Sequence, residues 1–313
     1  MMNVVFMGTP DFAVPTLEML IDSNHSISAV VTQPDKPKGR GKKESMPPVK
    51  EVALRHNLLV LQPEKIRTDE AFYKHIQSLN PDIIVVVAFG QILPESILAL
   101  PRYGCINVHG SLLPKYRGAA PIQWAILNEE PITGVTIMYM DKGMDTGDML
   151  LKKEMVISKE DTYASLHDKM KEVGAKALQE ALILLLEGKL ERTKQVNSEA
   201  TYAPIIEKSL GEIKWDNKSS KISALIRGLN PWPGGYTYYK GEVMKIWNAS
   251  VVEGNNDKAD PGTVLRVDKE GVFVKTLDGS LCIKEIQMPN KKRMPVSEYI
   301  KGNSIEIGMV LGI

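Results

Sequence analysis

The sequence predicts an α/β protein with an open, mainly parallel Rossmann-like sheet, covered by helices on both faces and followed by a small C-terminal OB-like β-barrel. Residues 82–89 are almost entirely apolar and β-branched, which is typical of a central parallel strand buried on both faces. Strand and helix patterns alternate up to about residue 190, as a parallel sheet requires. Short strands separated by turn signals after residue 235 predict the barrel.

Each element of the first part follows from its own residues. After a buried strand at 3–8, Thr9, Pro10 and Asp11 supply a cap, a first-turn proline and an acidic residue for a helix. Pro15 breaks or restarts that helix. Further strands are expected at 28–32, 58–61, 104–108, 132–140 and 149–157, with helices at 47–57, 68–79, 119–128 and 162–187.

The pattern of the sequence changes after residue 204, where a helix is expected at 219–227 and a turn-rich segment at 229–235. A chain of 313 residues is long enough for two domains, each with its own core. The strands of the barrel are expected at 236–239, 243–249, 262–267, 272–276 and 280–286. We therefore expect a first domain at 1–190, a linker at 191–207 and a second domain at 208–313.

Composition places the chain among soluble globular proteins. Charged residues make up 25% of it and the net charge is +1. The apolar runs at 4–7 and 178–186 do not qualify as a signal peptide or a membrane span, so we expect a cytoplasmic protein. Cys105 and Cys282 are too far apart to indicate a disulfide framework or a zinc site, and the histidines are scattered. We expect no metal.

Asn107 and His109 occupy alternate positions where a short buried strand ends. Side chains two residues apart on an extended backbone point to the same face, so an amide donor and an imidazole lie side by side. Such a pair is suited to stabilising negative charge on a carbonyl oxygen and to moving a proton. The alternative is a strand end whose Asn and His bind local backbone, and these two residues alone do not decide between the interpretations.

An acidic loop at 141–148 places Asp145 between two glycines, so its backbone can take conformations that most residues avoid. A carboxylate near His109 would favour the charged imidazolium and fix the orientation of the ring. The alternative for this loop is a solvated acidic turn or a weak cation site. The first strand–helix turn, at 8–11, lacks the glycine fingerprint of a dinucleotide site, so we reject a dinucleotide cofactor.

The segment 107–114 (Asn-Val-His-Gly-Ser-Leu-Leu-Pro), Gly118 and the Met-Asp-Thr-Gly loop at 144–147 together resemble the folate-dependent formyltransferases. The resemblance covers essentially the whole chain and implies 10-formyltetrahydrofolate as the formyl donor. The catalytic trio that it implies is Asn107, His109 and Asp145. The folate site that it implies comprises Ser111, Leu112, Leu113 and Pro114, with Phe89, Gly90 and Ile92 at the end of the strand at 82–89.

Other segments resemble the members of this family that formylate the methionine of initiator methionyl-tRNA, for translation initiation. These segments are 7–12, 33–37, 39–43 and 230–234, the last of which leads into the barrel. The resemblance implies initiator methionyl-tRNA as the partner and a barrel that supports the tRNA. Glycines beside Arg40, Lys42 and Lys43 suit contacts with tRNA phosphates. The alternative for these cations is a solvated loop.

The mechanism that follows is attack of the methionine amine on the formyl carbon, which makes a tetrahedral oxyanion. Asn107 donates a hydrogen bond to that oxygen, while His109, held by Asp145, stabilises the same charge and relays the proton of the amine. Two alternatives stay open: a formyltransferase acting on a nucleotide sugar or other small amine, and a non-catalytic RNA-binding protein with this fold. We also expect a monomer, a second phosphate contact at Lys291–Arg293, and Leu113–Pro114 as a candidate cis bond.

Overall fold

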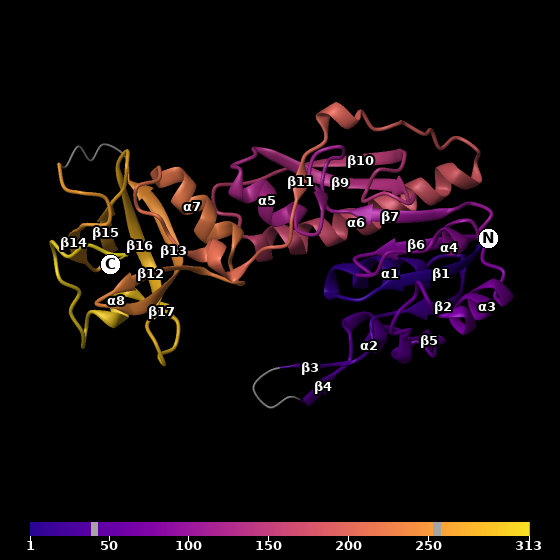
Figure 1. Cartoon of the computed structure of the whole chain (residues 1–313), viewed down its shortest axis with the longest axis horizontal. Coiled ribbons are helices and arrows are strands. Elements are labelled where there is room, and N and C mark those ends of the chain that lie inside the picture. The colour runs from indigo at the N-terminus through magenta and orange to yellow at the C-terminus, as the bar shows by residue number, and fades with distance from the viewer. Residues whose placement is uncertain (39–42, 253–257, 313) are drawn as a thin grey trace. The chain divides into compact units, whose positions relative to one another are not determined.

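The computed structural model of the chain describes residues 1–38, 43–252 and 258–312 (Figure 1). The contacts between residues divide the chain into two compact units. Unit 1 comprises Met1–Gly118, Thr133–Met155 and His167–Ala203, and unit 2 comprises Ala119–Ile132, Val156–Leu166 and Pro204–Ile313. Among the described residues, none of the helices combines the length and the apolar character that a bilayer span needs.

Unit 1 is built on a seven-stranded sheet in the order β10-β9-β7-β6-β1-β2-β5. β1 pairs in parallel with β2 and β6, β2 with β5, and β6 with β7, whereas β7 and β9 are antiparallel. The predicted open, mainly parallel sheet is therefore confirmed. The strands are β1 (Asn3–Gly8), β2 (Ser26–Val31), β5 (Val60–Leu61), β6 (Ile83–Val87), β7 (Cys105–His109), β9 (Ile132–Tyr139) and β10 (Met149–Val156).

Helices alternate with these strands along the chain, and both faces of the central strands are buried. All five residues of β6 are buried, which explains why its sequence lacks polar side chains. A short 3-10 helix (Asp11–Ala13) precedes α1, and Pro15 lies in the first turn of α1, as the sequence indicated. The helices are α1 (Val14–Ile21), α2 (Pro48–Arg55), α3 (Glu70–Ser78), α4 (Glu95–Leu98) and α6 (Tyr163–Leu186).

The two faces of β7 have different neighbours. On one face, Val108 packs against α6 at Gly174, where an added Cβ would lie 2.9 Å from the Val108 Cγ1 atom. On the other face, Cys105 belongs to the core cluster that also contains Ile97 of α4. Asn107 and His109 share the face of Cys105, because side chains alternate along a strand. The helix α6 therefore supports β7 on the face opposite to Asn107 and His109.

The segment around residue 40 is more regular than its proline and glycine content suggested. We predicted irregular structure from 33 to 43, whereas β3 (Lys36–Lys38) and β4 (Lys43–Ser45) form an antiparallel pair. The prediction was wrong for these flanks because Pro37 and its neighbours tolerate an extended ribbon of two strands, which forms a small sheet of its own.

The end of unit 1 contains structure where we expected a linker. β11 (Tyr202–Ala203) pairs in parallel with β8 (Arg117–Gly118), and a 3-10 helix spans Asn197–Glu199. Residues 191–203 therefore fold as part of unit 1. The division into domains at 1–190 and 208–313 stays a prediction.

Unit 2 contains the expected antiparallel sheet, in the order β12-β13-β16-β15-β14, with β17 beside β16. Its core cluster is apolar and includes Met244, Ile246 and Ile286 from the inward-facing positions. The strands are β12 (Gly235–Tyr239), β13 (Glu242–Val252), β14 (Val264–Asp268), β15 (Gly271–Lys275), β16 (Ser280–Gln287) and β17 (Met294–Pro295), and the helices of this unit include α5 (Pro121–Leu127), α7 (Ser219–Gly228) and α8 (Val296–Tyr299).

Short segments pair with the outer strands of this sheet. Beside β14, the Val264 amide donates to the Met309 carbonyl and the Gly308 amide to the Val264 carbonyl, both at 2.8 Å. Beside β12, the amides of Ile213 and Gly312 donate to the carbonyls of Tyr236 and Tyr238 at 2.8 and 2.9 Å. Residues 308–312 thus join the two ends of the sheet, as a small barrel requires.

Candidate active site

Asn107 and His109 lie on β7, between β6 and β9 in the middle of the unit 1 sheet. His109 is 5% exposed, and Asn107 is half-buried. Among the hydrogen bonds between described residues, none uses the side chain of Asn107. The amide of Asn107 is therefore a half-buried donor that the described residues leave available to a ligand.

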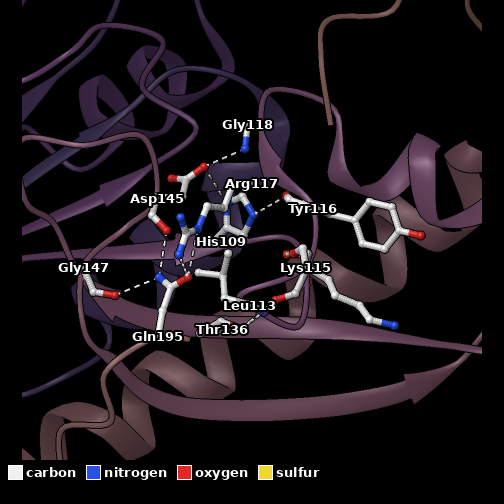
Figure 2. A network of polar contacts seen from close by, with 11 residues as sticks. His109, Leu113, Lys115, Tyr116, Arg117, Gly118, Thr136, Asp145, Gly147 and Gln195 are labelled. Carbon is white, nitrogen blue, oxygen red and sulfur yellow. Dashed lines mark hydrogen bonds and ion pairs between the residues drawn. The ribbon is translucent and has the colours of Figure 1, made fainter. Parts of the chain in front are cut away.

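Both ring nitrogens of His109 face oxygen atoms (Figure 2). Nε2 lies 3.0 Å from the carbonyl oxygen of Tyr116, so Nε2 carries a hydrogen in this arrangement, because a carbonyl only accepts. Nδ1 lies 3.6 Å from Oδ2 of Asp145. The structure thus brings together His109 and Asp145, which the sequence separates by 36 residues, and fixes the plane of the ring from both sides.

Asp145 occupies a backbone conformation with φ +53°, in the left-handed region that few residues with side chains adopt. Its Oδ2 atom accepts a hydrogen bond from the Gly118 amide at 2.8 Å. Gly118 has φ +118°, and a Cβ there would lie 2.9 Å from the Ala203 carbonyl oxygen, so glycine is required at this position. The carboxylate is therefore anchored beside His109 by a backbone amide.

The loop that carries Asp145 is also held through its backbone, by two residues that sequence reasoning did not assign to the site (Figure 2). The Gln195 side chain bonds the carbonyls of Asp145 and Gly147, and Arg117 in turn bonds Gln195. Arg117 lies between the motif segment 107–114 and Gly118, so its position was a usable signal. Gln195 lies in the expected linker, and no local pattern marks it.

The structure places the segment from Ser111 to Pro114 partly in the interior. Ser111 is buried, and its hydroxyl donates to the Lys115 carbonyl at 2.6 Å. Leu113 is fully buried and packs in a core cluster, and its peptide bond to Pro114 is cis, as the sequence suggested. Leu112 and Pro114 are half-buried and retain surface that a ligand can contact. In this segment the buried Ser111 and Leu113 therefore anchor the backbone, and the side chains between and after them stay partly exposed.

The segment that follows β6 also combines a buried residue with exposed ones. Phe89 is buried in the core cluster of the sheet, whereas Gly90 is exposed and Ile92 is 65% exposed. The Phe89 carbonyl accepts hydrogen bonds from Thr9 Oγ1 at 3.0 Å and from Gln33 Nε2 at 3.3 Å. These bonds tie the end of β6 to residues that follow β1 and β2, at the carboxyl edge where open α/β sheets bind ligands.

Of the three cations expected to contact tRNA, Arg40 and Lys42 lie outside the described residues, and so does the side chain of Lys43. The residue that precedes β3 is firmly held. Asp35 accepts from Lys50 Nζ at 2.7 Å and from Gln62 Nε2 at 2.8 Å. The hydrogen bond from Gln62, followed by that from Lys50, lowers the pKa of the Asp35 carboxyl below its ordinary value.

Across the described part of the chain, one group of side chains has metal-ligand spacing: Asp11, His167 and Asp168. The Lys171 ammonium already lies 2.7 Å from Oδ1 of Asp168 and 3.9 Å from Oδ2 of Asp11. The hydrogen bond to Asp168 raises the pKa of Lys171, so this cation stays charged. The chain's own lysine therefore offsets one of the two carboxylate charges and already occupies Oδ1 of Asp168.

Cys105 begins the strand that carries Asn107 and His109, and it is nearly inaccessible. Burial raises the pKa of its thiol to about 12. The thiolate, which is the nucleophilic form, is therefore negligibly populated at neutral pH. Cys105 therefore lacks the accessibility and the ionisation that a nucleophilic cysteine needs.

Comparison with known proteins identifies the class to which this fold and site belong. The formyl transferase family matches residues 2–182, and the C-terminal domain of formyl transferases matches residues 205–304. The chain therefore belongs to the formyl transferase family. Methionyl-tRNA formyltransferase of Clostridioides difficile is 58% identical to it over 99% of this chain and 100% of that protein.

Solved structures share the fold at lower sequence identity. An N-formyltransferase from Helicobacter canadensis, in complex with folinic acid and dTDP-3-aminofucose, is 20% identical with a TM-score of 0.68, covering 92% of this chain and 100% of that one. HypX from Aquifex aeolicus, in complex with tetrahydrofolic acid, is 19% identical with a TM-score of 0.64, covering 96% of this chain and 47% of that one.

Proposed function

We propose that this protein transfers the formyl group of 10-formyltetrahydrofolate to the methionine amino group of initiator methionyl-tRNA, as a cytoplasmic monomer that serves translation initiation. The observation that carries the proposal is the arrangement of Asn107, His109 and Asp145 at one strand end, in a chain that matches a methionyl-tRNA formyltransferase over its full length.

The reaction needs a base, an oxyanion site and a leaving group. The α-amine, with an ordinary pKa of roughly 7.7–8.0, loses a proton and attacks the formyl carbon, forming a carbon–nitrogen bond. The Asn107 amide donates a hydrogen bond to the resulting oxyanion, and His109 stabilises the same charge while Asp145 holds its ring. The bond from carbon to N10 of the folate then breaks, and N10 takes the proton that the amine has lost. For His109 to relay this proton, Nε2 exchanges the Tyr116 carbonyl for the substrate while Nδ1 stays beside Asp145.

Two observations support a folate as the donor. The Helicobacter and Aquifex proteins that share this fold bind folinic acid and tetrahydrofolic acid. In this chain, Ile92, Leu112 and Pro114 expose apolar surface at neighbouring strand ends, while Phe89 and Leu113 of the same segments are anchored in core clusters. Partly exposed apolar side chains on a rigid support suit a flat pterin ring.

The outer face of β12 and β13 favours a nucleic-acid acceptor over a small amine. Tyr236 and Tyr238 alternate with inward-facing residues, and Lys245 lies opposite Tyr236 on β13. Aromatic faces stack on nucleobases, and lysines contact phosphates. A cavity of about 530 Å³ on this face is lined by Lys208, Ser209, Trp232, Pro233, Tyr236, Tyr238, Val243 and Lys245, which we call the aromatic pocket.

The basic residues at Lys291–Arg293 extend this face. The Arg293 guanidinium lies 5.0 Å from the centre of the Trp247 ring and 2.6 Å from Glu285 Oε2, so its charge is already paired. Lys291 and Lys292 are exposed. We therefore assign phosphate contact to these two lysines and a structural role to Arg293.

The decisive experiment measures transfer of radiolabelled formyl from 10-formyltetrahydrofolate to initiator methionyl-tRNA, with a nucleotide amino sugar as a competing acceptor. We expect transfer to the tRNA, and loss of transfer in His109→Ala and Asp145→Ala with both substrates still bound. Transfer only to the sugar would establish the small-amine alternative. Tight tRNA binding without transfer to either acceptor would establish a non-catalytic protein.

A further inference from the structure

Gln195 links two parts of unit 1 that lie far apart in sequence (Figure 2). Its Nε2 donates to the carbonyl oxygens of Asp145 and Gly147 at 2.7 and 2.8 Å. Its Oε1 accepts from Nε and Nη2 of Arg117 at 3.0 and 2.8 Å. Carbonyls only accept and a guanidinium only donates, so a single orientation of the Gln195 amide satisfies both sides. The side chain is therefore a fixed link between Arg117 and the loop of Asp145.

The loop at 141–148 needs such a restraint. Asp145 is held at φ +53°, a conformation that costs energy for any residue with a Cβ. The loop's internal side-chain bonds lie at its exposed end, where Asp141 Oδ1 accepts from the Gly143 amide and from Thr146 Oγ1. These bonds shape the turn without tying it to His109. The hydrogen bonds from Gln195 and from the Gly118 amide are what fasten Asp145 to the rest of unit 1.

Arg117 is itself fixed by the turn that holds His109. It is 3% exposed, its backbone amide donates to the Thr201 carbonyl at 2.8 Å, and its Nη2 also donates to Asn197 Oδ1 at 2.9 Å. The preceding residue, Tyr116, supplies the carbonyl that accepts from His109. One short turn therefore sets both the ring of His109 and, through Gln195, the backbone of Asp145.

We propose that Gln195 is a positioning residue for formyl transfer, which holds the Asp145 carboxylate in register with His109 without contacting either substrate. The inference rests on the proposed function of this site. A displacement of a catalytic group by about 1 Å lowers a rate on the order of 100-fold. Loss of the two hydrogen bonds from Gln195 releases the loop on the side opposite the Gly118 amide, so we expect kcat rather than substrate binding to suffer.

The test compares Gln195→Met, which removes every polar contact, with Gln195→Glu, which keeps an acceptor for Arg117 but sets a carboxylate against two carbonyls. Asn197→Ala is the matched control, because it removes a partner of Arg117 and leaves the loop's bonds intact. We expect kcat to fall roughly 10- to 100-fold in both Gln195 variants, with KM for both substrates and the melting temperature near those of the control. Adding Gln195→Met to Asp145→Ala should not lower the residual single-turnover rate of Asp145→Ala any further, because both substitutions act through one carboxylate.

A loss of kcat that multiplies in the double variant, or a kcat equal to that of Asn197→Ala, would overturn the proposal. The nitrogen NMR signals of the His109 ring supply a readout that needs no acceptor, and they should change in Gln195→Met and stay unchanged in Asn197→Ala. If the wild-type chain transfers no formyl to methionyl-tRNA but these signals respond, the proposed function fails and the positioning role stands. Unchanged signals in Gln195→Met would refute the positioning role whatever the acceptor is.

Discussion

The candidate active site of unit 1 and the aromatic pocket of unit 2 use polar side chains in opposite ways. In unit 1, polar groups such as His109, Ser111, Arg117 and Thr136 are buried and joined by hydrogen bonds at the strand ends. Unit 2 also buries hydrogen-bonded polar groups such as Thr237 and Ser219, but its aromatic pocket and the lysines of that pocket lie on the outer face of the sheet. The unit 1 site is built to hold its polar groups in fixed positions, whereas the surface of unit 2 offers contact area and positive charge.

The physical reason lies in desolvation. A buried polar group must be hydrogen-bonded, so each buried member of the unit 1 network dictates the direction of its neighbour. An exposed lysine keeps its hydration and its rotamer freedom, so its attraction for a phosphate tolerates small displacements. The comparison therefore predicts that substitutions in unit 1 change kcat, whereas those on the outer face of unit 2 change the KM for the acceptor.

The largest effect on kcat is expected for substitution of Asn107, which is the strongest test of this comparison between the two units. Asn107→Ala removes one oxyanion donor, which costs about 2.7–4 kcal/mol of transition-state stabilisation, or 10²–10³-fold in kcat. KM for both substrates should stay within about twofold, because the donor acts on charge that develops only in the transition state. Steady-state kinetics on both substrates measure this. A variant with normal kcat and a raised folate KM would move Asn107 from catalysis to donor binding.

An intermediate effect is expected at Trp232, which is 50% exposed in the aromatic pocket. Trp232→Ala should raise the KM for methionyl-tRNA roughly 5- to 100-fold, because stacking on a base contributes about 1–3 kcal/mol, and kcat should not change. Leu277→Ala is the matched control, since Leu277 is 58% exposed in the same unit and does not line the pocket. Equal KM values for the two variants would remove the pocket from the acceptor site.

The smallest effect is expected at Asp35, in a polar cluster of unit 1 that lies outside the hydrogen-bond network around His109. Its folded pKa is below the ordinary 3.8, so the carboxylate stabilises the fold above that pH, and this contribution disappears as the pH falls through the folded value. Asp35→Asn should therefore lower the melting temperature slightly at pH 7 and not at all in strong acid, with kcat unchanged. A loss of kcat would show that polar clusters of unit 1 outside the network also tune catalysis.

Much of the fold was predictable because its signals are local. The apolar run of β6 and the alternation of β12 and β13 each report which faces are buried, and the structure has strands at both places. The β3–β4 pair was missed because Pro37 and the glycines near it signal a loop whether or not the flanking backbone pairs. Pairing between two short strands depends on partners that a single-sequence pattern does not specify.

The site was predictable as a set of residue types and less so as a set of contacts. The motif gave His109 and Asp145, and the structure places their side chains 3.6 Å apart. It did not reveal that Leu113 points into the core, because a motif fixes identity and not side-chain direction. Gln195 was missed because its partner Arg117 is 78 positions away, and no periodicity spans that distance.

The short segments beside β12 and β14 have a consequence for how the protein behaves in a crowded solution. An unpaired edge strand presents a row of free amides and carbonyls, on which a strand from another molecule can add. Here residues 212–213 and 308–312 already occupy those groups along part of each edge. The pairing is satisfied within one molecule, so the sheet that carries the aromatic pocket is a poor template for aggregation.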